Sequence, residues 1–288
     1  MKVSIVIPTY YRSKDLADLF ESLLRQSVKP LEVIVVDDTP TNVIERLCKI
    51  YHNVFEKLNI KLIYVRNYRE RSAAIARNIG ASMAKGEIIL FLDSDIILHN
   101  DYIKRILEVF EAKKEALGVQ GWILHRVKRR TLYLDNILRK IFLLVHLTKN
   151  SCGIFEYPYI LTEIINCSAL SGSNMAFKRV IFNEFRFDEN LLKYSYMEDL
   201  LFTHLIYKKY PSSLFITPYA KCIHKVSGEG RIKTSILEHS HLRACRKYVL
   251  KKLFGTRGVI IFGWQTLGLL TFNMLRKIRR LLRRVSIE

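Results

Sequence analysis

Short apolar runs alternate with amphipathic stretches along the first hundred or so residues of the chain. The apolar runs, bounded by Gly, Pro or Asp, are typical of strands buried on both faces of a parallel sheet. They predict strands at 3–7, 31–38, 61–67 and 88–92. Stretches with apolar or small residues at helical spacing lie between them and predict helices at 13–24, 43–55 and 71–86. This alternation predicts a doubly wound, mostly parallel α/β sheet.

The alternation changes after a further helix at 101–116 and a strand at 117–126. The next segments are an amphipathic stretch at 128–148, a small and polar segment at 168–179, a helix beginning near Glu198 and a strand at 213–225. The tail reads as a basic helix at 236–254, an uncharged stretch at 258–275 and a cationic run at 276–284. We therefore predict a domain over 1–230, with halves 1–116 and 117–230, and a helical extension over 231–288.

Acidic residues directly follow two of the predicted strands. Asp37 and Asp38 end the second, and Asp93 and Asp95 follow the fourth. In open α/β sheets, ligands bind beyond the carboxyl ends of such strands. Two carboxylates one residue apart repel each other unless a cation lies between them, and Mg²⁺ or Mn²⁺ suits carboxylates and phosphates. The pattern indicates a metal-diphosphate site; the plainer alternative is a turn or a helix cap.

The amino-acid composition limits the classes of molecule that the protein is expected to bind. The net charge of +20 indicates an anionic partner, which could be nucleic acid, anionic lipid or a phosphorylated substrate. The densest basic run is interleaved with Ile and Leu rather than with aromatic residues, which favours lipid over nucleic acid. Five scattered cysteines without a CxxC pair argue for reduced thiols and against a zinc site. The first apolar run is too short for a signal peptide, so we expect a cytoplasmic catalytic part.

Four sequence motifs follow one another along the chain: VSIVIPTYYR, LEVIVVDD, ARNIGASMAKGEIILFLDSDIIL, and GSNMAFKR with MEDLLF. With them the chain resembles the family-two inverting glycosyltransferases, which have the GT-A fold, over roughly residues 1–225. The resemblance implies a hexosyltransferase-type enzyme (EC 2.4) that moves a sugar from a nucleoside-diphosphate-sugar to a glycan or lipid-linked acceptor, with Mg²⁺ or Mn²⁺. The Gln-x-x-Arg-Trp signature of processive synthases is absent after Glu198 and Asp199, which implies a single transfer per encounter.

The resemblance also implies roles for individual residues. The catalytic base is Asp199, and the metal ligands are Asp95 and His224. The nucleotide-sugar is bound by Pro8, Thr9, Tyr10, Asp38, Arg77 and Asp93. The loop between donor and acceptor comprises Gly172, Ser173, Asn174 and Glu198. One departure is the Thr-Pro pair after Asp38, where the family usually has a small polar pair.

Each role has a plainer alternative. Asp38 could form a turn, and Arg77 could lie on a helix surface. Glu198 and Asp199 could be first-turn charges that the helix dipole favours. His224 could be a structural residue at a strand end. The small residues at 172–174 could form an ordinary loop, and Tyr10 could be part of the pocket wall.

The sequence pattern of the C-terminal extension, residues 231–288, predicts contact with a membrane. The stretch 258–275 has 18 residues without charge, close to the ~20 that span a bilayer, but polar residues and three glycines dilute it. With the cationic run that follows, the pattern favours a helix lying on an anionic leaflet over one crossing it, the third alternative being a core helix. We expect an enzyme peripheral to the cytoplasmic face of the membrane. The alternative function is a non-catalytic membrane- or nucleic-acid-binding protein on a glycosyltransferase-like scaffold.

Overall fold

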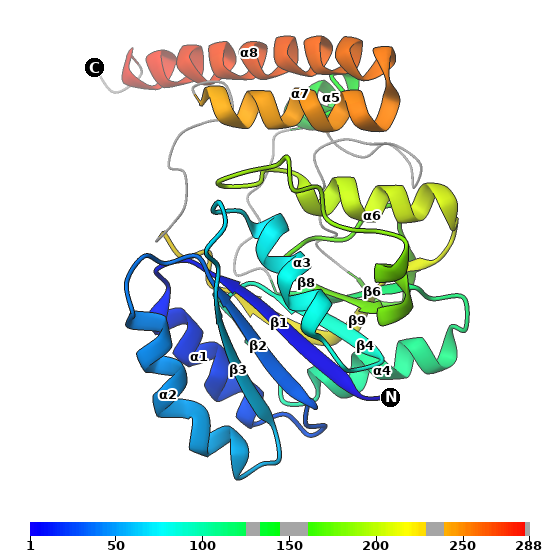
Figure 1. Cartoon of the computed structure of the whole chain (residues 1–288). Helices are drawn as coiled ribbons and strands as arrows, with labels where there is room; N and C mark the ends of the chain where they lie inside the picture. The colour runs from blue at the N-terminus through cyan, green and yellow to red at the C-terminus, as the bar shows by residue number, and fades with distance from the viewer. Residues whose placement is uncertain (125–132, 145–160, 229–238, 286–288) are drawn as a thin grey trace. The chain divides into compact units, whose positions relative to one another are not determined.

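The computed structural model describes residues 1–124, 133–144, 161–228 and 239–285 (Figure 1). Internal contacts divide the chain into two compact units. The first comprises Met1–Arg126 and Tyr159–Lys233, and the second comprises Val127–Pro158 and Thr234–Glu288. The second unit thus includes 127–158, which the sequence interpretation assigned to the domain over 1–230.

The first unit is built on one mixed sheet. Its described strands are β1 (Val3–Thr9), β2 (Glu32–Asp37), β3 (Lys61–Arg66), β4 (Ile88–Leu92), β5 (Ile96–Leu98), β6 (Gly118–Ile123), β7 (Ile165–Asn166), β8 (Asn174–Lys178) and β9 (Leu214–His224). Their order is β3-β2-β1-β4-β8-β6-β9-β5, and β7 pairs with β9. The first four strands run parallel, whereas β8 is antiparallel to both β4 and β6. The predicted α/β architecture is confirmed.

Helices cover both faces of this sheet. They are α1 (Ser13–Leu24), α2 (Val43–Glu56), α3 (Ala73–Met83), α4 (Tyr102–Ala112) and α6 (Glu198–Lys209), with a 3₁₀ turn at Arg179–Asn183. Right-handed crossovers bring α1 and α2 to one face of the parallel strands and α3 to the other (Figure 1). Burial of the continuous apolar strands between these layers forms the core, in which Ile5, Val35 and Phe91 are fully buried.

The segment 168–179 differs from its sequence pattern, since its second half forms strand β8. Met175, Ala176 and Phe177 are buried there between β4 and β6. Asn174 begins the strand although it is polar, because its amide is hydrogen-bonded: Gln120 Nε2 donates to its Oδ1 at 2.8 Å, and its Nδ2 donates to the Gly121 carbonyl at 3.1 Å. These long-range partners, rather than local propensity, make the strand.

The second unit contains three described helices: α5 (Tyr133–Ile141), α7 (Ser240–Phe254) and α8 (Thr256–Val285). Of the helix expected over 128–148, residues 128–132 and 145–148 lie outside the described residues. The uncharged stretch and the cationic run form one continuous helix, α8. Within the described residues, only Thr256–Leu275 is long and apolar enough to cross a membrane, judged by length and a mean hydropathy of 1.4; 22% of that window is buried in the fold.

Candidate active site

The carboxyl ends of β1, β2 and β4 meet at one edge of the sheet. Thr9 pairs with Asp37 where β1 and β2 end, and Asp93 follows β4, the other parallel neighbour of β1. The chain reverses its direction of winding between β3 and β4, so this edge is a topological switch point, where α/β sheets bind ligands.

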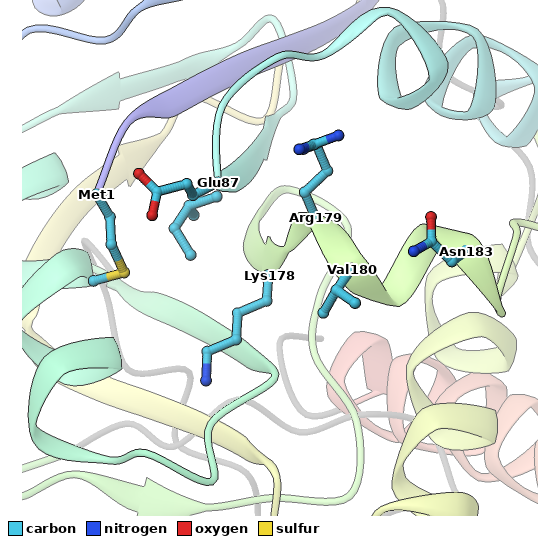
Figure 2. Close-up of a pocket in the computed structure, with 7 residues that line it drawn as sticks. Met1, Glu87, Lys178, Arg179, Val180 and Asn183 are labelled. Carbon is cyan, nitrogen blue, oxygen red and sulfur yellow. The ribbon is translucent and has the colours of Figure 1, made fainter.

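A pocket of about 400 Å³ lies elsewhere. Its lining includes Met1, Glu87, Lys178 and Arg179, at the start of β1 and β4 and the end of β8 (Figure 2). The amino ends of the parallel strands form the edge opposite the switch point, and none of the predicted site residues lines this pocket. We assign it no role.

Asp93, Asp95 and His224 form a cluster at the switch point. One ligand atom from each lies within 4.8 Å of the others. The antiparallel pairing of β5 with β9 aligns Ile96 with His224 and thereby brings the imidazole beside Asp95, with Nε2 at 3.2 Å from Asp95 Oδ1. The two carboxylates suit Mg²⁺ or Mn²⁺, and the imidazole adds a nitrogen ligand. The residues present therefore fit a divalent metal ion.

Asp95 is fully buried, yet its surroundings favour the ionised carboxylate. Burial alone would raise its pKa, but the hydrogen bond and charge of His224 and the positive charge of Arg12 outweigh burial and hold the pKa well below its ordinary value. Arg12 Nη1 lies 3.2 Å from Asp95 Oδ1, and the Ser227 N–H donates to Oδ2 at 3.0 Å. The protein thus keeps an ionised carboxylate ready for a cation.

Sequence reasoning missed Arg12. The residue immediately precedes α1 at its N-cap position and makes no side-chain cap there. A positive charge at a helix N-terminus is unfavourable to the helix dipole, so an arginine at this place was a signal of another role. Its partner Asp95 is 83 residues away, and only the fold shows their contact.

A second cluster surrounds the buried guanidinium of Arg77, on α3. Arg77 Nη2 donates to Asp93 Oδ1 at 3.0 Å and to the Gly172 carbonyl at 3.1 Å, while Nη1 donates to Glu198 Oε1. Burial raises the pKa of Glu198 to about 8; the charges of Asp199 and Asp93 also raise it, whereas Arg77 lowers it. Arg77 therefore links the Asp93 turn with the start of α6. Its predicted contact with the diphosphate stays a prediction.

Asp199 lies in the first turn of α6, beside Gly172. The Gly172 N–H donates to Asp199 Oδ2 at 2.7 Å, and the Leu200 N–H donates to Oδ1 at 2.8 Å. A Cβ atom at position 172 would lie only 3.0 Å from Arg77 Nη2 and 3.1 Å from Asp199 Cβ. Glycine is thus the residue that lets the loop backbone approach this carboxylate.

The loop residues Ser173 and Asn174 are buried and hydrogen-bonded. The Asp93 N–H donates to the Ser173 carbonyl at 2.9 Å, which holds the turn after β4. Gln120, a second residue that sequence reasoning missed, donates to Asn174 and accepts from the Ser171 N–H at 2.8 Å. Direct contact of this loop with donor or acceptor stays a prediction.

Asp38 and Tyr10 lie at the ends of β2 and β1. Asn67 Nδ2 donates to Asp38 Oδ1 at 2.6 Å, and the Ser72 N–H donates to its Oδ2 at 3.3 Å. The guanidinium carbon of Arg71 lies 4.4 Å from the centroid of the Tyr10 ring. This side of the edge offers a carboxylate and an aromatic ring, which are groups suited to a nucleoside.

Helix α3 connects three parts of the site, which lie around Asp38, around Asp93 and at the start of α6. Ser72, its N-cap, is held by Asp38, and its hydroxyl lies 2.8 Å from the hydroxyl of Ser195, in the loop before α6. Farther along the same helix, Arg77 contacts both Asp93 and Glu198. The structure thus brings most of the predicted residues into one hydrogen-bonded arrangement, while Pro8 and Thr9 lie at the end of β1.

Asp38 provides a pH-dependent test of this arrangement. Burial raises its pKa to about 6, so ionised Asp38 costs stability as pH rises through 6, and this cost is absent below its ordinary value of 3.8. The substitution Asp38→Asn removes one of the two acceptor oxygens at any pH but removes the buried charge only at neutral pH, so we expect its effect on the free energy of unfolding to be more favourable at pH 7 than at pH about 3.5 by about 1–2 kcal/mol. Urea unfolding of the wild type and of the variant, at pH 7 and at pH about 3.5, measures this free energy at each pH. An effect of equal size at both pH values would contradict the expectation.

Comparisons with known proteins found a matching family model and several similar proteins. A family model described as glycosyl transferase family 2 matches residues 4–186. Glycosyltransferase GlyA of Streptococcus pneumoniae serotype 4 is 22% identical over 191 residues, which cover 65% of this chain and 26% of GlyA. The match therefore spans about a quarter of the length of that curated relative.

Two solved structures have a similar fold. Staphylococcus aureus TarS 1-349 in complex with UDP-GlcNAc superposes with a TM-score of 0.55 at 20% identity, covering 94% of this chain and 73% of that one. GalNAc-T7 with UDP, GalNAc and Mn²⁺ superposes with a TM-score of 0.59 at 16% identity, covering 87% of this chain and 48% of that one. At these identities the likeness shows the fold alone.

Proposed function

Because this chain belongs to glycosyl transferase family 2 and has the predicted GT-A fold, we propose that it transfers a sugar from a nucleoside-diphosphate-sugar to a glycan or lipid-linked acceptor. The observation that carries the proposal is the placement of two chemically distinct groups at one sheet edge. A metal-binding cluster of Asp93, Asp95 and His224 is linked through Arg77 to the carboxylate pair of Glu198 and Asp199. A metal ion can stabilise a diphosphate leaving group, and a carboxylate can remove the proton of an acceptor hydroxyl.

The metal-binding cluster would serve the leaving group. Asp93, Asp95 and His224 would hold Mg²⁺ or Mn²⁺, and GalNAc-T7, a structural neighbour, was solved with Mn²⁺. When bound, such an ion supplies Lewis-acid stabilisation to a departing diphosphate. Asp38 and Tyr10 would bind the nucleoside, which places the diphosphate toward Asp93.

Asp199 would act as the general base. An acceptor hydroxyl is a weak nucleophile, so its proton must be removed as its oxygen attacks the anomeric carbon. The proton passes to Asp199, the new C–O bond forms, and the bond to the diphosphate breaks, releasing the nucleoside diphosphate. A single displacement of this kind inverts the anomeric configuration. The hydrogen bond from Gly172 orients Asp199 Oδ2 in the resting protein.

We further propose that transfer occurs at the cytoplasmic face of a membrane. The net charge of +20 and the apolar, basic tail support an anionic lipid surface as a partner and do not favour nucleic acid. A lipid-linked or membrane-exposed acceptor would be presented at that surface. Each transfer would be a single event, as the missing processive signature implies.

The proposal is tested by hydrolysis of the donor, which needs no known acceptor. We expect slow release of nucleoside diphosphate from one class of nucleotide-sugar in the presence of Mn²⁺ or Mg²⁺, and its loss on addition of EDTA. Release is measured across UDP-, GDP- and dTDP-sugars by a coupled phosphate assay or chromatography. If every donor is left intact and none binds by calorimetry, the chain is a non-catalytic binding protein on this scaffold.

A further inference from the structure

Helix α8 carries an apolar stripe along its exposed side. Its most exposed residues between 258 and 275 are all apolar or glycine. The large ones are Val259, Ile260, Trp264, Leu267, Leu270 and Met274. Spacings of three and four residues place Ile260, Trp264 and Leu267 on one side of the helix. Ile260 is 71% exposed and Met274 is 58% exposed, so the stripe extends along most of the uncharged stretch.

Helix α5 extends this stripe. Trp264 Nε1 donates to the Ile141 carbonyl at 2.8 Å, and the Trp264 ring lies 5.1 Å from that of Phe142. The exposed side chains of Ile137 and Ile141 on α5 belong to the same three-helix unit. An indole with its N–H satisfied and its ring half exposed is suited to a lipid headgroup boundary.

The opposite side of α8 is fixed by a buried polar contact. Gln265 is 1% exposed, and its Oε1 accepts from Arg246 Nε at 3.0 Å and from Arg246 Nη2 at 2.6 Å. Gln265 Nε2 in turn donates to the Leu143 carbonyl after α5. These bonds set the rotation of α8, and hence the apolar stripe faces away from α7.

Basic residues accompany the stripe. Helix α7 exposes Arg243, Lys247, Lys251 and Lys252. The sequences of α7 and α8 contain no aspartate or glutamate, and α8 continues into the cationic run at 276–284. Apolar side chains next to an excess of Lys and Arg are complementary to an anionic bilayer surface.

We infer that the three-helix unit docks on an anionic lipid bilayer, with α8 lying in the interface and its apolar stripe buried at the boundary between headgroups and acyl chains. The inference deepens the proposed function and rests on it for the choice of a membrane as partner. Helix α7 runs alongside α8 and joins it through Gly255, whose φ of +60° favours glycine (Figure 1). A crossing α8 would carry the buried Arg246 and the lysines of α7 into hydrocarbon. Lying in the interface leaves those charges in the headgroup region.

Vesicle binding of the full chain tests the docking surface. We expect binding to phosphatidylcholine vesicles that contain phosphatidylglycerol and little binding to phosphatidylcholine alone. The double variant Leu267→Gln, Leu270→Gln should weaken binding by roughly tenfold or more, because both side chains leave the apolar boundary. The matched control is Ile50→Gln, Val54→Gln, a pair of exposed apolar residues on α2, which should bind like the wild type.

Three outcomes would overturn the docking surface. They are equal flotation of the α8 variant and the wild type, equal binding to both lipid compositions, and a dimer in the absence of lipid that the α8 variant dissociates. The last would show that a second copy of the chain covers the stripe.

The depth of spin labels tests the orientation of α8. Labels are placed at Ile260→Cys, Leu267→Cys and Met274→Cys, with Cys152→Ser in the background and the four buried thiols retained. If α8 lies in the interface, power-saturation EPR should find all three at the same shallow depth. A helix that crosses with residues 256–275 would place position 267 about 6 Å deeper than position 260 and about 10 Å deeper than position 274, at 1.5 Å per residue, and would overturn the inference.

Donor hydrolysis in solution separates the two proposals. The α8 variant should hydrolyse donor at the wild-type rate, because no residue of the candidate active site is changed. Failure of vesicle binding with intact hydrolysis would refute the docking surface alone. Vesicle binding without hydrolysis would refute the proposed function and leave the membrane as the site of another activity.

Discussion

Asp199→Asn is expected to reduce the rate of sugar transfer by about 10²–10⁴-fold, which is the contribution typical of a positioned general base. The amide matches the carboxylate in shape and retains an oxygen that can accept the hydrogen bond from the Gly172 N–H. It cannot take a proton from the acceptor hydroxyl. The loss should therefore be in kcat, with donor binding by calorimetry and the circular dichroism spectrum unchanged.

A matched control for this variant is Glu111→Gln, which neutralises an exposed carboxylate on α4. It should retain the wild-type rate. Wild-type transfer by Asp199→Asn would remove Asp199 as the base. Glu198 is the neighbouring candidate, but its carboxyl group is engaged by Arg77.

Asp95→Asn is expected to weaken Mn²⁺ binding by on the order of 100-fold or more. Substitutions of groups that merely support a ligand already cost about 10–100-fold in affinity, and this change removes a ligand charge. Mn²⁺ binding by EPR measures the effect without any turnover. Metal-dependent donor hydrolysis should decrease in parallel.

The same variant should also be less stable at neutral pH. The depressed pKa of Asp95 contributes stability above the ordinary pKa of 3.8, and this contribution is lost as pH falls through the lower folded-state pKa. Asp101→Asn, which removes an exposed carboxylate paired with Arg105, serves as the matched control and should leave Mn²⁺ affinity intact. Unchanged Mn²⁺ affinity in Asp95→Asn would place the metal site elsewhere.

The parallel half of the fold and the acidic strand ends could be predicted because their signals are local. A continuous apolar run such as 88–92, ending in Asp93 and Asp95, carries both the strand and its chemistry in a few residues. The prediction that Asp199 is the base came from the order of the family motifs, because a first-turn carboxylate alone is commonplace.

The other features of the fold and of the candidate site depend on contacts between residues that are far apart in the sequence. Strand β8 is held by Gln120 and by its neighbours β4 and β6, none of which its own five residues, Asn174–Lys178, indicate. Arg12 meets Asp95 only because the loop after β1 and the turn after β4 lie at the same edge of the sheet. The grouping of 127–158 with the tail likewise involves contacts such as that between Phe142 and Trp264.

The shared contacts of Arg77 have a consequence for protein engineering. A single side chain on α3 holds the turn that begins with Asp93, the Gly172 backbone and the first residue of α6. Replacing 172–199, a segment that includes β8, with a foreign sequence would leave this arginine without two of its three partners. Chimeras that exchange this segment should therefore exchange α3 with it.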